Sequence, residues 1–279
     1  MQQSDYKMTT PPLIDRKYHQ ATTVPDALHA KREMVPEAVY LGGGTALQLG
    51  WSDGEVPPSL IDVAALRRPA PCELDQDHLH LCAFTPLEAF RTDPLVQREF
   101  NALSMALETI ASFEVRGLGT LGGNVTWTKG DLRPLMLAVG AEAITSDGAI
   151  PFARWIEHRE PDTLLLSIRI PRASKGVIFE KVGFRAAFSP SCVTLSYCFH
   201  GGRACVAIGG GENRVGRLRR AEVALSSRLP LTLVELTKMI SDEGLLAHDA
   251  ACSADVRAEM TARILLSARL DLERRNAGA

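Results

Sequence analysis

The stretch Val115-Arg116-Gly117-Leu118-Gly119-Thr120-Leu121-Gly122-Gly123-Asn124 decides how this sequence is interpreted, together with Leu41-Gly42-Gly43-Gly44-Thr45-Ala46-Leu47 about 70 residues earlier. Eight of the chain's 22 glycines lie within Leu41–Leu47 and Gly117–Gly130. Glycine tolerates positive φ and close approach to the backbone, and consecutive amides in such turns can bind an anion. The two segments therefore predict either a phosphate-binding backbone or, as the simpler alternative, tight turns without a ligand.

The segment from Gly117 to Gly122 also matches the dinucleotide pattern G-x-G-x-x-G. That pattern requires a strand before it and a helix that begins inside it. The residues that follow, including Gly123, Val125 and Thr126, are poor helix formers, so we predict a loop over Gly117–Gly130 and exclude a Rossmann fold. The chain also lacks the G-x-x-x-x-G-K-[ST] pattern of P-loop nucleotide triphosphatases.

Before this loop, apolar spacing and turn residues predict a mixture of short helices and strands. The first ~15 residues carry no periodicity and are expected to form a loose arm. A helix with Thr22 or Thr23 as its cap and Pro25 in its first turn is expected next. The predicted elements are a helix over Pro25–Glu33, strands over Val39–Leu41, Ser59–Val63 and His78–Cys82, and one helix or two short helices between Pro94 and Ala111.

After the loop, the pattern predicts a buried helix that ends at Gly140, then a hairpin around Ser146-Asp147-Gly148. The pattern of expected elements changes near Pro171–Lys175, where strands of a new sheet begin. This change suggests a domain boundary, with domains over 1–172 and 173–279. The remaining expected elements are a helix over Leu132–Val139, strands over Thr163–Ile170, Val177–Val182, Val193–Phe199 and Arg203–Ile208, and helices near Leu231–Leu246 and Asp255–Leu272. This mixture predicts an α+β fold.

The composition is that of an ordinary soluble globular protein, with 46% hydrophobic and 23% charged residues. The net charge of −2 does not favour binding to nucleic acid or to an anionic membrane. No apolar run reaches the ~18–20 residues of a membrane span, and we expect a cytoplasmic protein. The six cysteines are scattered, without the spacing of a zinc or iron–sulfur site, and most are expected to be buried free thiols.

A few polar residues have two possible roles each. His78 and His80 share one strand face, where paired surface histidines are favoured over a metal site because no third ligand is near. Lys181 and Arg185 fit a small anion site or a solvated edge equally well. Asp131 is placed to cap the following helix or to accept hydrogen bonds from ligand hydroxyls. No catalytic triad or carboxylate pair is evident.

The two glycine-rich segments resemble the "A-G-G-T-D-L" and "I-R-N-x-x-T-I-G-G-N" loops of the FAD-binding subunit of molybdenum hydroxylases, the xanthine dehydrogenase and carbon monoxide dehydrogenase group. Gly130-Asp131-Leu132-x-Pro134, Lys181-x-Gly183-x-Arg185 and Ala207-Ile208-Gly209-Gly210 are similar to later segments of that family. The resemblance spans roughly residues 17 to 272. The order and spacing of the motifs carry it, more than any one motif alone.

The resemblance implies a two-lobed PCMH-type FAD-binding domain with a lobe boundary near residue 70, followed by a smaller α+β domain of the carbon monoxide dehydrogenase flavoprotein type. FAD would lie between the lobes. The backbone of the two glycine-rich segments would hold its pyrophosphate and ribityl chain, Asp131 would accept from its hydroxyls, and Ile110 would pack near the flavin ring. The full implied cofactor set is Leu41, Gly42, Gly43, Gly44, Thr45, Ala46, Leu47, Ile110, Thr120, Gly122, Gly123, Asn124, Asp131 and Lys181.

The implied function is that of an oxidoreductase subunit in an electron relay, with no catalytic residue and no metal of its own. Its partners would be a molybdopterin-containing large subunit and a two-iron two-sulfur small subunit, with an acceptor such as NAD or a quinone.

The main alternative is a degenerate relative that keeps the fold, binds no FAD and serves as an assembly or scaffolding subunit. Three departures from the family pattern motivate it: Ala46 replaces an acidic residue, Val125–Lys129 is about two residues short, and Ser189-Pro190-Ser191 replaces "D-I-A". A stand-alone flavoprotein oxidase is a third possibility, but no catalytic acid or base is evident for it.

Overall fold

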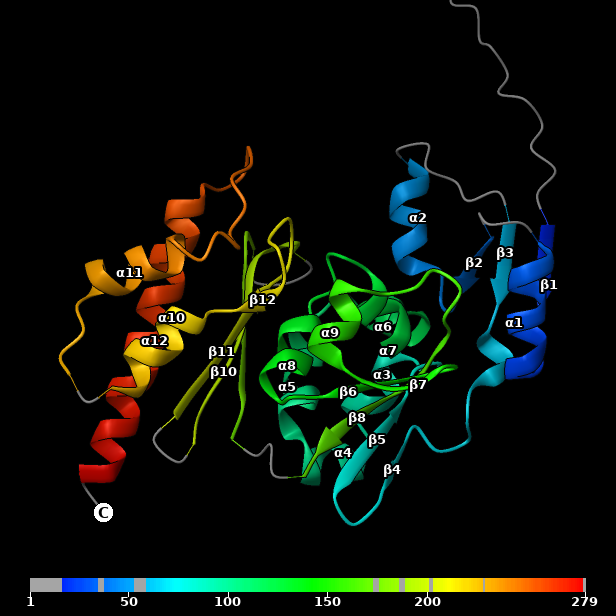
Figure 1. The fold of residues 1–279 in the computed structure, drawn as a ribbon, viewed down its shortest axis with the longest axis horizontal. Coiled ribbons are helices and arrows are strands. Elements are labelled where there is room, and N and C mark those ends of the chain that lie inside the picture. The colour runs from blue at the N-terminus through cyan, green and yellow to red at the C-terminus, as the bar shows by residue number, and fades with distance from the viewer. Residues whose placement is uncertain are drawn as a thin grey trace, which may run out of the picture.

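The computed structural model contains three β-sheets in a row, each with its own helices (Figure 1). The structure describes residues 17–34, 38–52, 59–172, 176–185, 189–200, 203–227 and 229–277. The expected N-terminal arm lies outside these residues, as does part of the expected boundary at Pro171–Lys175. The α+β prediction is confirmed.

The first sheet is small and parallel, with strand order β1-β3-β2. Its strands are β1 (Lys17–Gln20), β2 (Ala38–Leu41) and β3 (Ser59–Asp62), and its helices are α1 (Val24–Glu33) and α2 (Thr45–Ser52). Helix α1 begins as the sequence predicts, because the Thr23 hydroxyl accepts from the Asp26 amide and Pro25 stands in the first turn. The first glycine-rich segment connects β2 to α2 and includes the first turn of α2, so this sheet fixes the position of that segment.

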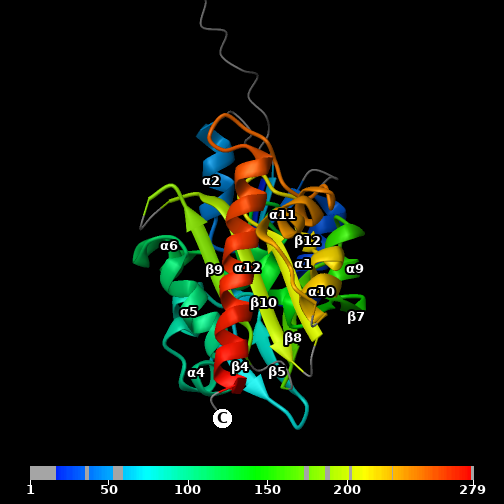
Figure 2. The ribbon, with the colours of Figure 1, turned by 90° about the vertical axis from the view of Figure 1, so that its left-hand side faces the viewer.

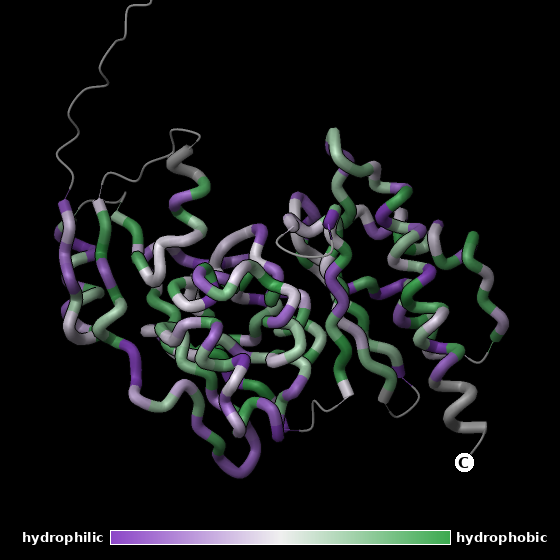
Figure 3. The backbone as a smooth tube through the Cα atoms, turned by 180° about the vertical axis from the view of Figure 1, so that it is seen from behind, coloured by the Kyte–Doolittle hydropathy of each residue, from purple (hydrophilic) through white to green (hydrophobic). Residues whose placement is uncertain are grey.

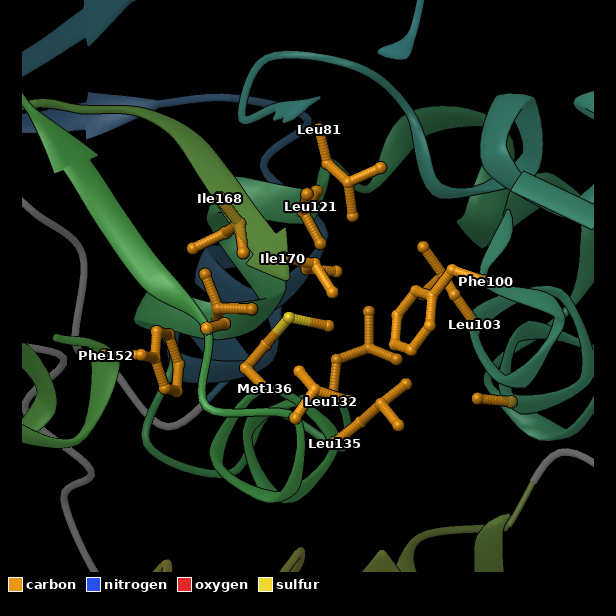
Figure 4. Packing of buried hydrophobic residues seen from close by; sticks show 14 of the residues in the cluster. Leu81, Phe100, Leu103, Leu121, Leu132, Leu135, Met136, Phe152, Ile168 and Ile170 are labelled. Atoms are coloured by element: carbon orange, nitrogen blue, oxygen red, sulfur yellow. The ribbon is translucent and has the colours of Figure 1, made fainter. Parts of the chain in front are cut away.

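The second sheet has five antiparallel strands in the order β4-β5-β8-β6-β7. Its strands are β4 (Cys72–Leu74), β5 (His78–Cys82), β6 (Glu142–Thr145), β7 (Gly148–Pro151) and β8 (Leu165–Pro171). The helices around it are α3 (Leu87–Arg91), α4 (Pro94–Glu99), α5 (Asn101–Thr109), α6 (Phe113–Leu118), α7 (Leu121–Thr126), α8 (Arg133–Ala138) and α9 (Phe152–Glu157), and a 3-10 turn spans Ala64–Leu66. Leu132, Leu135 and Met136 from the α8 region pack against Ile168 and Ile170 of β8 in the main core (Figure 4).

The third sheet is antiparallel, with order β12-β11-β10-β9. It contains β9 (Ile178–Gly183), β10 (Ser191–His200), β11 (Arg203–Gly209) and β12 (Gly216–Arg217). Helices α10 (Arg219–Ser226), α11 (Leu233–Ser241) and α12 (Ala254–Ala277) follow, and α12 runs across one face of this sheet (Figure 2). The sheet also packs against α8 and α5, so it adjoins the main core.

Most of the predicted strands and helices are present. The hairpin is formed by β6 and β7, Gly140 ends the α8 segment with φ +64°, and the span from Pro94 contains two short helices, α4 and α5. The elements not predicted have 2 to 8 residues: β1, α2, the 3-10 turn, β4, α3, α6, α7, α9, β12 and α10.

The predicted loop over Gly117–Gly130 is wrong in part, because Leu121–Thr126 form the short helix α7. Leu121 and Val125 are fully buried, and the Thr120 side chain caps the helix by accepting from the Gly123 amide. Burial and capping thus override the weak helix propensity of this segment. A helix and not a strand precedes it, so the Rossmann fold stays excluded.

Within the described residues, no helix combines the length and the apolar character needed to cross a membrane. Hydrophobic and hydrophilic residues are mixed along α12, the longest helix (Figure 3).

Candidate cofactor site

The two glycine-rich segments touch each other in the folded chain. A Cβ atom on Gly43 would lie 1.8 Å from the Leu118 carbonyl oxygen, and one on Gly42 would lie 2.6 Å from Thr120 Oγ1. From the other side, a Cβ on Gly119 would lie 3.0 Å from Thr45 Oγ1. The absence of side chains at these positions therefore lets two segments about 75 residues apart pack backbone to backbone.

The first segment presents unpaired backbone donors. Gly44 has φ +70°, and its carbonyl accepts from the Gln48 amide at 3.0 Å at the start of α2. Among the residues that the structure describes, the amides of Gly43, Gly44, Thr45 and Ala46 donate to no protein acceptor. Unpaired amides at a helix N-terminus next to a left-handed glycine can bind a phosphate group.

The second segment differs, because its amides are already used. Leu121 N donates to Thr85 O at 3.1 Å, Gly122 N to Ala83 O at 2.8 Å, and Asn124 N to Thr120 O at 3.0 Å. Gly123 N donates to Thr120 Oγ1 at 3.1 Å. Of the two segments, the first is therefore the one whose amides are left available for a ligand within the described residues.

Two residues of the second segment, Gly123 and Asn124, remain available to a ligand. Gly123 is exposed, and a Cβ there would meet Thr120 Oγ1 at 3.2 Å as its one near neighbour. The Asn124 side-chain oxygen accepts from the Leu132 amide at 3.0 Å. The NH₂ group of the Asn124 side chain is therefore left available to donate to a ligand.

Asp131 does not cap helix α8, contrary to one of its two predicted roles. Leu132 occupies the N-cap position without a side-chain cap, while the Asp131 carboxylate accepts from Ser191 Oγ at 2.5 Å. Lys181 Nζ lies 3.0 Å from the other carboxylate oxygen, and the two side chains are only 8% and 13% exposed for Lys181 and Asp131. Lys181 is therefore not on a solvated edge; it ties the α7–α8 connection to the third sheet.

Ile110 is placed differently from the other implied residues. Its side chain is 4% exposed and packs in the main core. Its carbonyl accepts from Arg116 at 3.0 Å, next to Ala111, whose backbone is left-handed with φ 52°. The contact with a flavin ring stays a prediction.

Arg116 is a residue that sequence reasoning left without a role. Its guanidinium donates to the Ile110 and Ala111 carbonyls and pairs with Glu88, whose carboxylate also pairs with Arg91. The two arginines hold the pKa of Glu88 below its ordinary value of 4.5. The sequence offers no signal for this role, because the left-handed turn at Ala111 is not encoded by a glycine or asparagine.

The paired histidines share one acidic neighbour, Asp75. Nε2 of His80 lies 2.7 Å from Asp75, and Nδ1 of His78 lies 3.7 Å from the same carboxylate. The hydrogen bond from His80 lowers the pKa of Asp75. Across the described parts of the chain, no group of three His, Cys, Asp or Glu side chains is arranged to hold a metal ion.

Comparison with known proteins identifies similar chains. The nicotinate dehydrogenase FAD-subunit of Eubacterium barkeri is 29% identical over 100 residues, or 36% of this chain and 33% of that protein. A putative xanthine dehydrogenase FAD-binding subunit of Escherichia coli is 31% identical over 111 residues, or 39% of this chain and 37% of that protein. The matched parts thus cover about a third of the length of these relatives.

Solved structures share the fold. A chain of quinoline 2-oxidoreductase from Pseudomonas putida 86 superposes with a TM-score of 0.76 at 22% identity, covering 91% of this chain and 97% of that one. The family model described as the FAD binding domain in molybdopterin dehydrogenase matches residues 12–173, more than half of the sequence. Since the converging glycine-rich segments lie inside this match, the chain belongs to the family of FAD binding domains in molybdopterin dehydrogenases.

Proposed function

We propose that this chain is the FAD-binding, electron-transferring subunit of a molybdopterin-dependent dehydrogenase or hydroxylase. The observation that carries the proposal is the contact between the two glycine-rich segments, beside which the first segment keeps unpaired amides from Gly43 to Ala46. Such a turn fits the diphosphate of a dinucleotide cofactor, because backbone donors and the helix α2 N-terminus both favour negative charge.

The residues present fit FAD. The segment Leu41–Leu47 would hold the diphosphate through its backbone. Thr120, Gly122, Gly123 and Asn124 would flank the cofactor, with Gly123 leaving room where a side chain would stand. FAD, when bound, supplies the capacity to take up and release electrons, whereas the protein supplies position and electrostatics.

Asp131 and Lys181 keep hydrogen-bonding capacity for the cofactor. A carboxylate has about four lone-pair sites and a lysine ammonium has three donors. Asp131 uses sites for Ser191 and Lys181, and Lys181 uses a donor for Asp131. The remaining sites would serve the hydroxyl and carbonyl groups of FAD. Ile110 would pack near the flavin ring from the side of the main core.

The partners in this proposal are a molybdopterin-containing subunit, which would oxidise the substrate, and a two-iron two-sulfur subunit, which would deliver electrons to this chain. The acceptor would be NAD or a quinone. The two similar chains are named as FAD subunits of dehydrogenases, which supports the part of this proposal that places FAD on one subunit of a larger enzyme.

We also propose the domain limits 1–172 and 173–279, with two lobes that meet near residue 70. The sheets support this division, because the first ends at Asp62, the second begins at Cys72 and the third begins at Ile178.

The test is an absorption spectrum of the purified chain after incubation with FAD and desalting. We expect a retained flavin band near about 450 nm, a property of the cofactor. Gly123→Val is expected to abolish retention, because a branched side chain would fill the cofactor's space. Gly117→Val is the matched control: a side chain at this exposed helical glycine meets nothing within 4 Å. If both variants retain FAD as the wild type does, the cofactor is not held at this segment.

A second candidate function is a fold-retaining assembly subunit without FAD. It is favoured by the internal use of the amides from Leu121 to Asn124 and by the Asp131–Lys181 pair, since these amides and the two opposite charges already have partners within the chain. A folded wild-type chain that retains no flavin, alone or with its partner subunits, would support this candidate and contradict the first.

A further inference from the structure

Two arginines hold the connection between α7 and α8. Arg133, in the first turn of α8, donates from Nη1 to the Thr128 carbonyl at 2.8 Å. Arg159, just after α9, donates from Nη1 to the Thr126 carbonyl, also at 2.8 Å. Helices α8 and α9 contact each other (Figure 1). The two hydrogen bonds bring both guanidiniums to one short segment, Thr126–Thr128.

Neither guanidinium has an acidic partner among the described residues, although most other buried charges here are paired. Arg133 is 8% exposed, and its Nε is buried without a hydrogen-bond acceptor. A buried charge normally requires a counter-charge and a buried N–H normally requires an acceptor.

The electrostatics of Arg133 favour an anion beside it. Burial lowers the pKa of Arg133, and the positive charge of Arg159 lowers it further. An anion between the two guanidiniums would remove this repulsion and satisfy donors that the protein leaves free. Arg159 is exposed, so an anion can reach the pair from solvent.

We propose that Arg133 and Arg159 form a binding site for a phosphate-type oxyanion at the α7–α8 connection. Each guanidinium has five N–H donors in a planar fork that matches phosphate oxygens, and the protein uses one donor of each. The phosphate group has two possible sources: the diphosphate of the chain's own dinucleotide, or a separate phosphate-bearing molecule. The inference does not depend on the proposed function.

The test is calorimetric titration of the full chain with inorganic pyrophosphate, in both FAD-free and FAD-treated form, at constant ionic strength set by sodium chloride. We expect saturable binding of one pyrophosphate per chain at this pair, counted as the part of the binding that the arginine changes weaken. Arg159→Gln is expected to weaken it by about 10- to 100-fold through loss of charge-assisted hydrogen bonds. Arg133→Lys keeps the charge but loses the fork, and is expected to weaken binding as well. Arg154→Gln, on the exposed side of α9, is the matched control.

The outcomes distinguish the two phosphate sources, and they test the anion site separately from FAD binding. Binding that the arginine changes weaken and FAD treatment abolishes assigns this pair, in place of Leu41–Leu47, to the cofactor's own diphosphate. Binding that the arginine changes weaken and that persists after FAD treatment assigns the pair to a separate molecule. No saturable binding by the wild type at millimolar pyrophosphate overturns the site, as does unchanged binding by Arg159→Gln and Arg133→Lys. Flavin retention is measured from the absorption spectrum of the same samples. If the chain does not bind FAD, the titration of the FAD-free chain still tests the anion site.

Discussion

Gly43 lies where the two glycine-rich segments touch, and its position relative to the Leu118 carbonyl leaves no space for a side chain. Gly117 lies in the same quoted motif, but a side chain there would meet nothing within 4 Å. Glycine thus has two different structural roles in these two segments. One glycine permits a backbone contact, while the other is simply a weak residue in a helix.

Gly43→Ala is therefore expected to push the two segments apart. We expect a loss of about 1–3 kcal/mol in the free energy of unfolding, the scale of an overpacked site, together with reduced FAD retention. Gly117→Ala is expected to leave retention unchanged and to raise stability by up to about 1 kcal/mol, because alanine is the better helix former. Urea unfolding and the desalted flavin spectrum measure both effects. Equal behaviour of the two variants would contradict the contact at Gly43.

Glu88 carries a pH-dependent contribution to stability. Its side chain is 14% exposed and pairs with Arg91 and Arg116, which lower its pKa below 4.5. Because the folded state binds the proton less readily than the unfolded state, this contribution is present at neutral pH. It disappears as the pH falls below 4.5 through the folded-state pKa.

Glu88→Gln is expected to lower the free energy of unfolding at neutral pH by about 2 kcal/mol, and the gap to wild type is expected to narrow on acidification below about pH 4.5. Urea unfolding over a pH series measures the gap. Glu157→Gln, an exposed position on α9, serves as control and should track the wild type throughout. A gap for Glu88→Gln that stays constant down to acid pH would show that the ion pairs contribute nothing.

At the scale of elements, the Asp131–Lys181 pair joins the α7–α8 connection to β9. Both side chains are largely buried, and Ser191 of β10 completes the cluster. Removing one member of such a pair leaves the other charge buried and unpaired, which costs more than removing both. The pair therefore acts as a tether between the second and third sheets.

A double-mutant cycle with Asp131→Ala and Lys181→Ala tests this tether. Each single change is expected to cost about 3–5 kcal/mol of unfolding free energy, and the double variant is expected to lose less than the sum, by about 1–3 kcal/mol. The exposed pair Glu259–Arg263 on α12 provides the control, with changes within about 0.5 kcal/mol. A coupling energy near zero for Asp131 and Lys181 would mean that the two groups do not interact in solution.

Helix α7 shows where local sequence rules fail. Gly122, Gly123 and Thr126 argue against a helix, yet the chain is helical there because Leu121 and Val125 are anchored in the core. The amides of Leu121 and Gly122 also find acceptors in Thr85 and Ala83, which lie some 36 to 39 residues away in sequence. By contrast, the β6–β7 hairpin was predictable because its turn and both of its strands are adjacent in sequence.

At the scale of the molecule, the main core crosses the proposed domain boundary. It contains Val177 and Ala207 from the C-terminal part, and Cys198, Cys205 and Val215 pack against it. Helix α8 contacts both β10 and β11. The third sheet is therefore covered by α12 on one face, where the C-terminal part has a core cluster of its own, and by the second sheet's helices on the other, where it shares the main core.

Both parts are consequently expected to unfold in one transition. Tryptophan fluorescence reports the N-terminal part, because Trp51, Trp127 and Trp155 all precede residue 173. Hydrogen exchange of β10 and β11 peptides reports the C-terminal part. We expect the two probes to give coincident urea midpoints. Earlier loss of protection in β10 and β11 would instead show that the two proposed domains unfold independently.

The sequence by itself determined the α+β class, most helices and strands, and the family resemblance through two glycine-rich motifs. These follow from periodicity and turn chemistry, which are local properties of the chain. Only the tertiary structure decided that the amides of Leu121–Asn124 are used internally, that Asp131 pairs with Lys181 and Ser191, and that Nε of Arg133 is buried without an acceptor among the described residues. Such partners are set by how the three sheets pack, because residues 50 to 60 apart in sequence meet through that packing and not through any local pattern.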